Sequence, residues 1–331
     1  MQKTRVRRRS RPRPPFHRRE ELLRPLQPAR AELAGADMTT TLFTASGVRL
    51  RCRGRQTGLL NWLFLPGGPG IGSESLEELA SALDLPGAVW LVDLPGDGSN
   101  RKPPGAPADP YSVWPQVLVE AAMALPNVVF AGHSTGGMYL LATPQLEQHI
   151  CGLVLLDSAP DAAWHARFVG MTQRNPLPAV EAATAVYEAD RCDENIAAIA
   201  VASAPWNFTP SAIPAGQELL SRMPYNSAAV EWSDAHFDHT YRAAWWPRTL
   251  PVLVLAGAED RIVWQGGWDS PSYRGANVSH ASIPSAGHFP WIDNPDAVTE
   301  AFCTFAARMT KTAHDDARPP HPSGSSRLES P

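Results

Sequence analysis

The sequence has few cysteines and no long apolar run, and each shortage excludes a class of protein. Its 331 residues include four cysteines, none in a Cys-x-x-Cys pair and none near a histidine at metal-ligand spacing. No segment approaches the roughly 18 to 20 apolar residues of a membrane-spanning helix. Even the apolar run at 252–256 is closed off by Pro251 and Gly257. We therefore predict a cytoplasmic protein with reduced thiols, no metal site built on its cysteines and no membrane span.

Basic residues are concentrated in the first 37 positions and are scarce afterwards. Residues 1–37 hold 11 of the 29 Lys and Arg but only 4 of the 33 Asp and Glu, which leaves the rest near −11. Such a head is compatible with a nucleic-acid arm, a membrane-surface arm or a transit peptide. It is, however, rich in proline and poor in apolar residues. We predict disordered extensions at 1–37 and 311–331, and no nucleic-acid binding by the folded body.

The body alternates strand-like and helix-like segments. Two short alternating runs flank Ser46-Gly47 and predict a hairpin. Apolar strands are predicted at 59–65, 88–94, 127–131, 152–156, 251–257 and 278–284, and helices at 73–83, 113–124, 135–148 with a break at Pro144, and 295–309. This alternation predicts βαβ units and a parallel sheet.

The alternation stops for about ninety residues after Asp157. The segment 158–248 is rich in alanine and tryptophan, has a helical pattern and is interrupted by prolines. A helical insertion after the sixth strand is the simplest account. We therefore predict a core in two parts, 38–157 and 249–310, with a helical lid at 158–248.

The strongest chemical signal is Gly132-His133-Ser134-Thr135-Gly136, which lies where a strand ends and a helix begins. In this context Gly-x-Ser-x-Gly forms a nucleophile elbow, a turn so tight that both outer positions need glycine. The serine is then presented near a helix N-terminus, whose amides favour developing negative charge. Ser134 is the predicted nucleophile.

A serine hydroxyl needs a base, and His288 is the best placed of the ten histidines. It follows the last predicted strand and returns to the same sheet edge as Ser134. The competitors are weaker, because they fall in the elbow, within a strand or in the insertion: His133, His280, His236 and His239.

The acid that orients the histidine is predicted to be Asp260. It follows the strand at 251–257 through a short turn and gives the chain order Ser, Asp, His. Two alternatives stay open: Asp157, which ends the preceding strand, and Glu259, which lies in the same turn.

Acyl transfer also needs two N–H donors for the oxyanion. The backbone N–H of Thr135, directly after the nucleophile, is one candidate. The other is Gly68 in the glycine-rich loop at 66–70, since Pro66 and Pro69 have no N–H. No Gly-Lys-Ser/Thr follows this loop, which excludes a phosphate-binding loop of that type.

From about Met38 to Met309 the chain resembles the α/β-hydrolase superfamily in the order and spacing of its motifs. These are the elbow, the loop at 66–70, the segment 93–99, the turn at 257–260 and the Ala-Gly-His of 286–288. The resemblance implies an α/β fold with a mostly parallel central sheet of about eight strands. It also implies a serine hydrolase that cleaves a small ester or amide through an acyl-enzyme and needs no metal and no organic cofactor.

The loop at 66–70 is most similar to the His-Gly-Gly-Pro-Gly loop of proline iminopeptidases. This sequence departs from that group at Pro66, where the group has His, and in Gly-His-Ser-Thr-Gly, where it usually has Gly-Gly-Ser-Trp-Gly. An aminopeptidase would also need insertion carboxylates for the substrate amine. The available ones are Glu181, Glu188, Glu194, Glu231 and Asp234.

Two further questions stay open at this level. Seven tryptophans predict either an aromatic pocket for an apolar group or core packing: Trp164, Trp206, Trp232, Trp245, Trp246, Trp264 and Trp268. A fold of this class can also serve a small-molecule binding protein without catalysis. The oligomeric state leaves no mark on the sequence.

Overall fold

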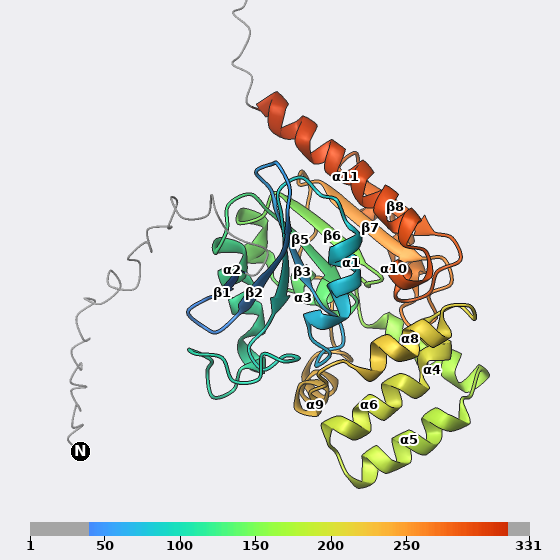
Figure 1. Cartoon of the computed structure of the whole chain (residues 1–331). Helices are drawn as coiled ribbons and strands as arrows, with labels where there is room; N and C mark the ends of the chain where they lie inside the picture. The colour runs from blue at the N-terminus through green and yellow to red at the C-terminus, as the bar shows by residue number, and fades with distance from the viewer. Residues whose placement is uncertain (1–39, 317–331) are drawn as a thin grey trace, which may run out of the picture. The chain divides into compact units, whose positions relative to one another are not determined.

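The computed structural model describes residues 40–316, so the predictions for 1–37 and for 317–331 lie outside the described residues. The described part contains a central sheet with helices on both faces (Figure 1). None of its helices combines the length and apolar character that a membrane crossing requires.

The sheet has eight strands in the order β1-β2-β4-β3-β5-β6-β7-β8. β1 pairs antiparallel with β2 and β2 with β4, whereas the other five pairs are parallel. The strands are β1 (Thr41–Phe43), β2 (Arg49–Arg55), β3 (Asn61–Leu65), β4 (Ala88–Asp93), β5 (Val128–His133), β6 (Gly152–Leu156), β7 (Val252–Gly257) and β8 (Val278–Ile283). The prediction of a mostly parallel sheet of about eight strands is confirmed.

The central strands are buried on both faces. Every residue of β4, β5, β6 and β7 is buried, which matches their apolar sequences; the polar residues are Asp93 at the end of β4 and His133 at the end of β5. The edge strand β8 instead keeps exposed positions between half-buried ones. Because parallel strands end at the same edge, the loops after β3, β5, β6, β7 and β8 lie along one side of the sheet.

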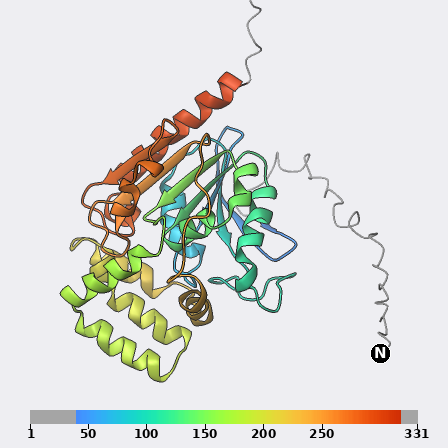
Figure 2. The same ribbon diagram turned by 180° about the vertical axis from the view of Figure 1, so that it is seen from behind.

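Helices cover both faces of this sheet (Figures 1 and 2). On one face Phe302 is fully buried and packs against Phe64 of β3, with ring centroids 5.8 Å apart. On the other face Trp114 meets Tyr139 at 5.2 Å. Complete burial of a phenylalanine side chain stabilises a fold by about 2 to 3 kcal/mol. The core helices are α1 (Glu77–Ala82), α2 (Trp114–Met123), α3 (Thr135–Leu141), α10 (Pro290–Asp293) and α11 (Pro295–Asp316).

The last helix is longer than predicted. We expected it to end at Met309 and assigned 311–331 to a disordered tail, but α11 continues to Asp316. Residues 310–316 contain neither glycine nor proline, and the first helix breaker is Pro319. The predicted end was therefore placed too early.

The segment between β6 and β7 is helical, as its pattern predicts. Pro178 and Pro205 stand in the first turns of their helices, where a missing N–H costs no hydrogen bond. Leu219 and Leu220 pack into the main core, whereas Trp206 joins a separate small cluster with Met171. The helices are α4 (Ala163–Arg174), α5 (Pro178–Ala189), α6 (Asp193–Ala202), α7 (Ala204–Asn207), α8 (Ile213–Ser221) and α9 (Ser227–His236).

Candidate active site

Ser134 lies on a strained turn between β5 and α3. Its φ of 51° and ψ of −124° are disfavoured for a residue with a Cβ atom. The turn depends on glycine on both sides. A Cβ on Gly132 would lie 2.5 Å from the Gly137 nitrogen, and one on Gly136 would lie 2.3 Å from the Pro66 oxygen. The backbone thus fixes the Ser134 hydroxyl at the carboxyl edge of the sheet.

His288 and Asp260 complete a hydrogen-bonded chain from this serine. His288 Nε2 lies 3.1 Å from Ser134 Oγ, and His288 Nδ1 lies 3.1 Å from Asp260 Oδ2. Ser134 and His288 are 8% and 4% exposed, and the Asp260 side chain is inaccessible to solvent. The alternative acid Glu259 is exposed in the turn. The structure brings together the three residues that the sequence singles out.

Backbone and side-chain donors hold the Asp260 carboxyl group. Oδ1 accepts hydrogen bonds from the Ile262 and Val263 N–H groups at 2.8 and 3.1 Å, and the Gln265 amide donates to Oδ2 at 3.3 Å. A buried carboxylate requires such donors to offset its lost hydration. No sequence pattern pointed to Gln265.

His133 contacts His288 but not the serine hydroxyl. It is buried, and its Nε2 lies 2.9 Å from the His288 carbonyl oxygen. Burial, and then the charge of His288, hold the pKa of His133 well below its usual value. A neutral His133 therefore donates its Nε2 proton to that carbonyl and anchors the His288 loop. His133, which the sequence offered as an alternative base, thus holds the loop that carries His288.

The two predicted oxyanion donors belong to the loop at 66–70 and to the start of α3. A Cβ on Gly67 would lie 2.7 Å from the Ser134 Cβ, so the loop at 66–70 passes directly over the nucleophile. Gly68 has a φ of +115°, in the region that favours glycine. Thr135 opens α3, so its N–H has no acceptor within the helix. Thr135 directly follows the nucleophile, and Gly68 directly follows the glycine that lies against the Ser134 Cβ.

Two segments of the insertion contact the loops around Ser134. The His288 N–H donates to the Asn207 carbonyl oxygen at 2.7 Å. The Asn226 N–H donates to the Gly70 carbonyl oxygen at 2.7 Å, and the Asn226 side chain donates to the Gly96 carbonyl oxygen. The insertion therefore holds both the histidine loop and the glycine-rich loop, a role that its sequence does not reveal.

Asp97 makes the stability of the folded protein depend on pH. Its Oδ1 accepts a hydrogen bond from the Gly70 N–H at 2.9 Å, and burial, reinforced by the charge of Asp93, raises its pKa to about 7. In the unfolded chain the carboxyl ionises near its ordinary value of 3.8. Between about pH 4 and pH 7 the folded protein therefore keeps a proton that the unfolded chain loses, and stability falls as pH rises.

We expect Asp97→Asn to remove this part of the pH dependence. The variant keeps an oxygen for the Gly70 N–H but has no charge to bury, so above pH 7 it should be more stable than the unmutated protein by about 1 to 4 kcal/mol. Urea unfolding at pH 4, 5.5 and 8 measures the difference, which should grow with pH. A difference independent of pH would contradict the assignment.

One group of three potential metal ligands occurs among residues 40–316: Asp157, Asp260 and His288, whose ligand atoms lie within 4.8 Å of one another. The geometry of His288 limits this option. Its Nδ1 already faces Asp260 at hydrogen-bond distance, and the same nitrogen cannot both donate a proton and bind a metal.

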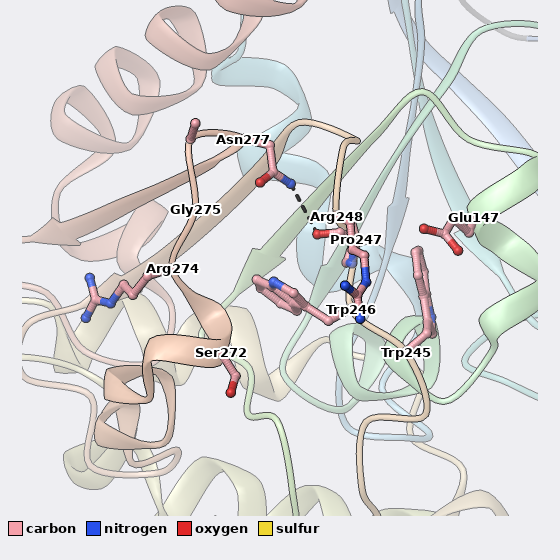
Figure 3. Close-up of a pocket in the computed structure, with 10 residues that line it drawn as sticks. Glu147, Trp245, Trp246, Pro247, Arg248, Ser272, Arg274, Gly275 and Asn277 are labelled. Atoms are coloured by element: carbon pink, nitrogen blue, oxygen red, sulfur yellow. Dashed lines mark hydrogen bonds between the residues drawn. The ribbon is translucent and has the colours of Figure 1, made fainter.

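Neither of the two pockets found among the described residues is lined by Ser134. One, of about 950 Å³, is bordered by Trp245 and Trp246 and by segments that lead into β7 and β8 (Figure 3). These are the amino ends of the strands, whereas the serine lies at the carboxyl ends. The other, of about 430 Å³, is lined by Asp260, Trp264 and Trp268.

The remaining predicted pocket and subsite residues have other surroundings. Trp206 packs in the small cluster of the insertion, and Trp232 stacks on His236. Glu231 accepts a hydrogen bond from the Tyr187 hydroxyl and lies 3.7 Å from Arg191. The other four carboxylates weighed for the substrate amine are exposed: Glu181, Glu188, Glu194 and Asp234.

A mostly parallel eight-stranded sheet, with a serine on a strained strand-to-helix turn, defines the class of α/β hydrolases. Residues 62–301 match the family model described as Alpha/beta hydrolase family. The chain belongs to this family. It is therefore a hydrolase enzyme, and the fold class expected from the sequence is confirmed.

The chain is similar to esterases and to proteins of the iminopeptidase group. It is 26% identical over 255 residues to a pimeloyl-[acyl-carrier protein] methyl ester esterase of Xanthomonas oryzae, an alignment covering 72% of this chain and 91% of that protein. A proline iminopeptidase-related protein of Thermus thermophilus has a TM-score of 0.60 at 21% identity, covering 83% and 97%. A thermophilic esterase of Thermogutta terrifontis has a TM-score of 0.57 at 19% identity, covering 82% and 99%. The two solved structures establish likeness of fold alone.

Proposed function

We propose that the protein is a serine hydrolase that cleaves a small ester through an acyl-enzyme intermediate. Ser134 is the nucleophile, His288 the general base and Asp260 the acid that orients the histidine. The observation that carries the proposal is the pair of 3.1 Å contacts that join Ser134 Oγ to His288 and His288 to Asp260. The positive φ of Ser134 shows that the turn holds this serine in a strained conformation. Amide cleavage by the same groups is the second candidate.

The proposed reaction has two halves. His288 Nε2 takes the Ser134 proton as Oγ attacks the carbonyl carbon, and the resulting imidazolium returns the proton to the leaving alcohol. Water then repeats the cycle on the acyl-enzyme. The N–H groups of Gly68 and Thr135 would stabilise the oxyanion, and each such donor lowers a barrier by about 3 to 4 kcal/mol. Every step uses groups of the chain, so we propose neither cofactor nor metal.

The charge of the insertion favours a neutral substrate. Residues 158–248 contain six arginines, no lysine and ten Asp and Glu, so this segment would repel a strongly acidic substrate or partner. The aminopeptidase alternative receives less support, because among the five carboxylates weighed for the substrate amine Glu231 is paired with Arg191 and the other four are exposed. The name of the Xanthomonas relative supports ester cleavage.

We place the protein in the cytoplasm. The support is that Cys52, Cys151, Cys192 and Cys303 are all unpaired. Proteins of oxidising compartments use cysteines as disulfides more often than proteins of reducing ones.

The test is the initial rate of the purified full chain on short-chain aryl esters, beside prolyl and alanyl anilides. Ester hydrolysis that Ser134→Ala abolishes, and that the exposed Ser221→Ala leaves intact, is the expected result. Ser134-dependent release from the anilides alone would establish the aminopeptidase instead. No turnover together with no labelling of Ser134 by a fluorophosphonate would mean a binding protein on the same fold.

A further inference from the structure

A second carboxyl group, that of Asp157, lies beside the candidate triad. Asp157 directly follows β6, has a φ of +44° and is completely buried. Its Oδ1 accepts a hydrogen bond from the Gly257 N–H at 2.8 Å. Its Oδ2 is buried and has no partner with a donatable proton in the part of the chain that the structure describes. One oxygen of a buried carboxyl group thus lacks a donor.

Two of the three titratable groups that face Asp157 are carboxyl groups, and the third is the His288 imidazole, whose Nδ1 already faces Asp260. The three groups are Asp260 from the turn after β7, His288 from the loop after β8 and Asp293 from α10. The ligand atoms of Asp157, Asp260 and His288 lie within 4.8 Å of one another. Two ionised carboxylates at this separation in a dry site repel strongly, so such pairs retain one proton.

The location of the retained proton follows from the donors around each carboxyl group. Asp260 accepts hydrogen bonds from two backbone N–H groups, the Gln265 amide and the His288 imidazole, all of which favour its ionised form. Asp157 accepts one. Burial raises the pKa of Asp157 well above its ordinary value, and the charge of Asp260 raises it further, while the Gly257 N–H opposes them. The proton therefore resides on Asp157.

We propose that Asp157 is a positioning residue for the triad, whose protonated Oδ2 donates a hydrogen bond to the Asp260 carboxylate. The proposal rests on the proposed function in so far as Asp260 is the acid of that triad. It gives the unpartnered oxygen a partner and limits the pair to one negative charge. One negative charge suffices to stabilise the His288 imidazolium. A second negative charge would hold the proton on the imidazolium more tightly and so slow its transfer to the leaving group.

Infrared difference spectroscopy tests the protonation without any turnover. Spectra of the full chain at pH 8, where Asp97 is mostly ionised, are compared between the unmutated protein and Asp157→Asn. We expect a band of a protonated carboxyl group that the substitution removes. Its absence from the difference spectrum would overturn the proposal. Because this result needs no substrate, it stays distinct from a failure of the proposed hydrolase activity.

The positioning role is tested by kinetics on the ester that the protein turns over. Asp157→Ala removes the donor, and we expect kcat to fall about tenfold to a hundredfold with little change in KM, as for a misplaced catalytic group. Asp157→Asn has an amide N–H that can donate to Asp260, and it should recover at least tenfold over Asp157→Ala. The exposed Asp190→Ala serves as a control.

The pH profile tests whether Asp157 is neutral in the active enzyme. If Asp157 is neutral, Asp157→Asn leaves the acid limb of the kcat/KM profile where it is. If Asp157 were ionised, the same substitution would remove a negative charge beside the imidazolium and move that limb to lower pH, which would overturn the proposal. Full activity of Asp157→Ala would overturn it as well. Urea unfolding of each variant verifies that a folded protein is compared.

Discussion

Asp260→Asn is expected to lower kcat on an ester substrate on the order of 10⁴-fold, with KM little changed, as for the equivalent acid of serine proteases. The reason lies in the donors around the carboxyl group. The amide oxygen of an asparagine would accept from the Ile262 and Val263 N–H groups, as Oδ1 does now. Its NH₂ group would then face His288 and donate to Nδ1. The imidazole would carry its proton on Nε2 and could not accept the proton of Ser134.

Steady-state kinetics on an aryl ester, with unfolding curves for each variant, measure this effect. Glu259→Gln is the matched control, because Glu259 is adjacent in sequence but exposed. It should retain the activity of the unmutated protein. The assignment of Asp260 fails if Asp260→Asn stays within tenfold of that activity, or if Glu259→Gln loses as much.

Most of the sheet could be predicted because its strands are short apolar runs between turn residues. β6 lies at Gly152–Leu156, the range predicted for it. The strand expected at 59–65 begins instead at Asn61, since Leu59 is 80% exposed in the preceding turn. The sequence alone does not show whether an apolar residue at the end of a strand is buried or exposed. The central strands are easy to predict because burial on both faces makes them continuously apolar. The exact residues at which a strand begins and ends depend on local packing.

The candidate triad could be expected from the sequence for a topological reason. Ser134, Asp260 and His288 each follow a predicted strand, and parallel strands bring their carboxyl ends to one edge. The same rule brings Asp157 beside Asp260, because β6 and β7 are neighbours. The chain order favours Asp260 over Asp157, and the coordinates add that the Asp260 carboxyl group is the one that meets His288 Nδ1.

The contacts made by the insertion could not be predicted. Asn207 accepts the His288 N–H, and Asn226 binds the loop that contains Gly70. Both contacts join positions far apart in sequence, and they depend on how α7 and α9 pack on the core. Helical periodicity reports which face of a helix is apolar but not which loop that helix approaches.

The second large effect is expected from adding a Cβ atom to Gly257, where β7 passes close to the loop that carries His288. A Cβ on Gly257 would lie 2.0 Å from the Gly287 carbonyl oxygen and 2.4 Å from that of Ala286. Both atoms are backbone, so Gly257→Ala must displace the loop that carries His288 or the end of β7. We expect kcat to fall at least about a hundredfold, because a displacement near 1 Å has that cost. We also expect stability to drop by about 1 to 3 kcal/mol through overpacking.

Gly54→Ala in β2 is the matched control for this prediction. It makes the same chemical change at a position where a Cβ would meet nothing within 4 Å, so stability and kcat should both stay near those of the unmutated protein. Urea unfolding and ester kinetics on the two variants separate crowding from the loss of a flexible residue. If Gly257→Ala matched Gly54→Ala in both measurements, the approach of β7 to the His288 loop would not fix the position of the base. If it lost stability but kept kcat, the strain would be absorbed by β7, and the hydrogen bonds of His288 to Asp260 and of its N–H to Asn207 would be sufficient to hold the imidazole.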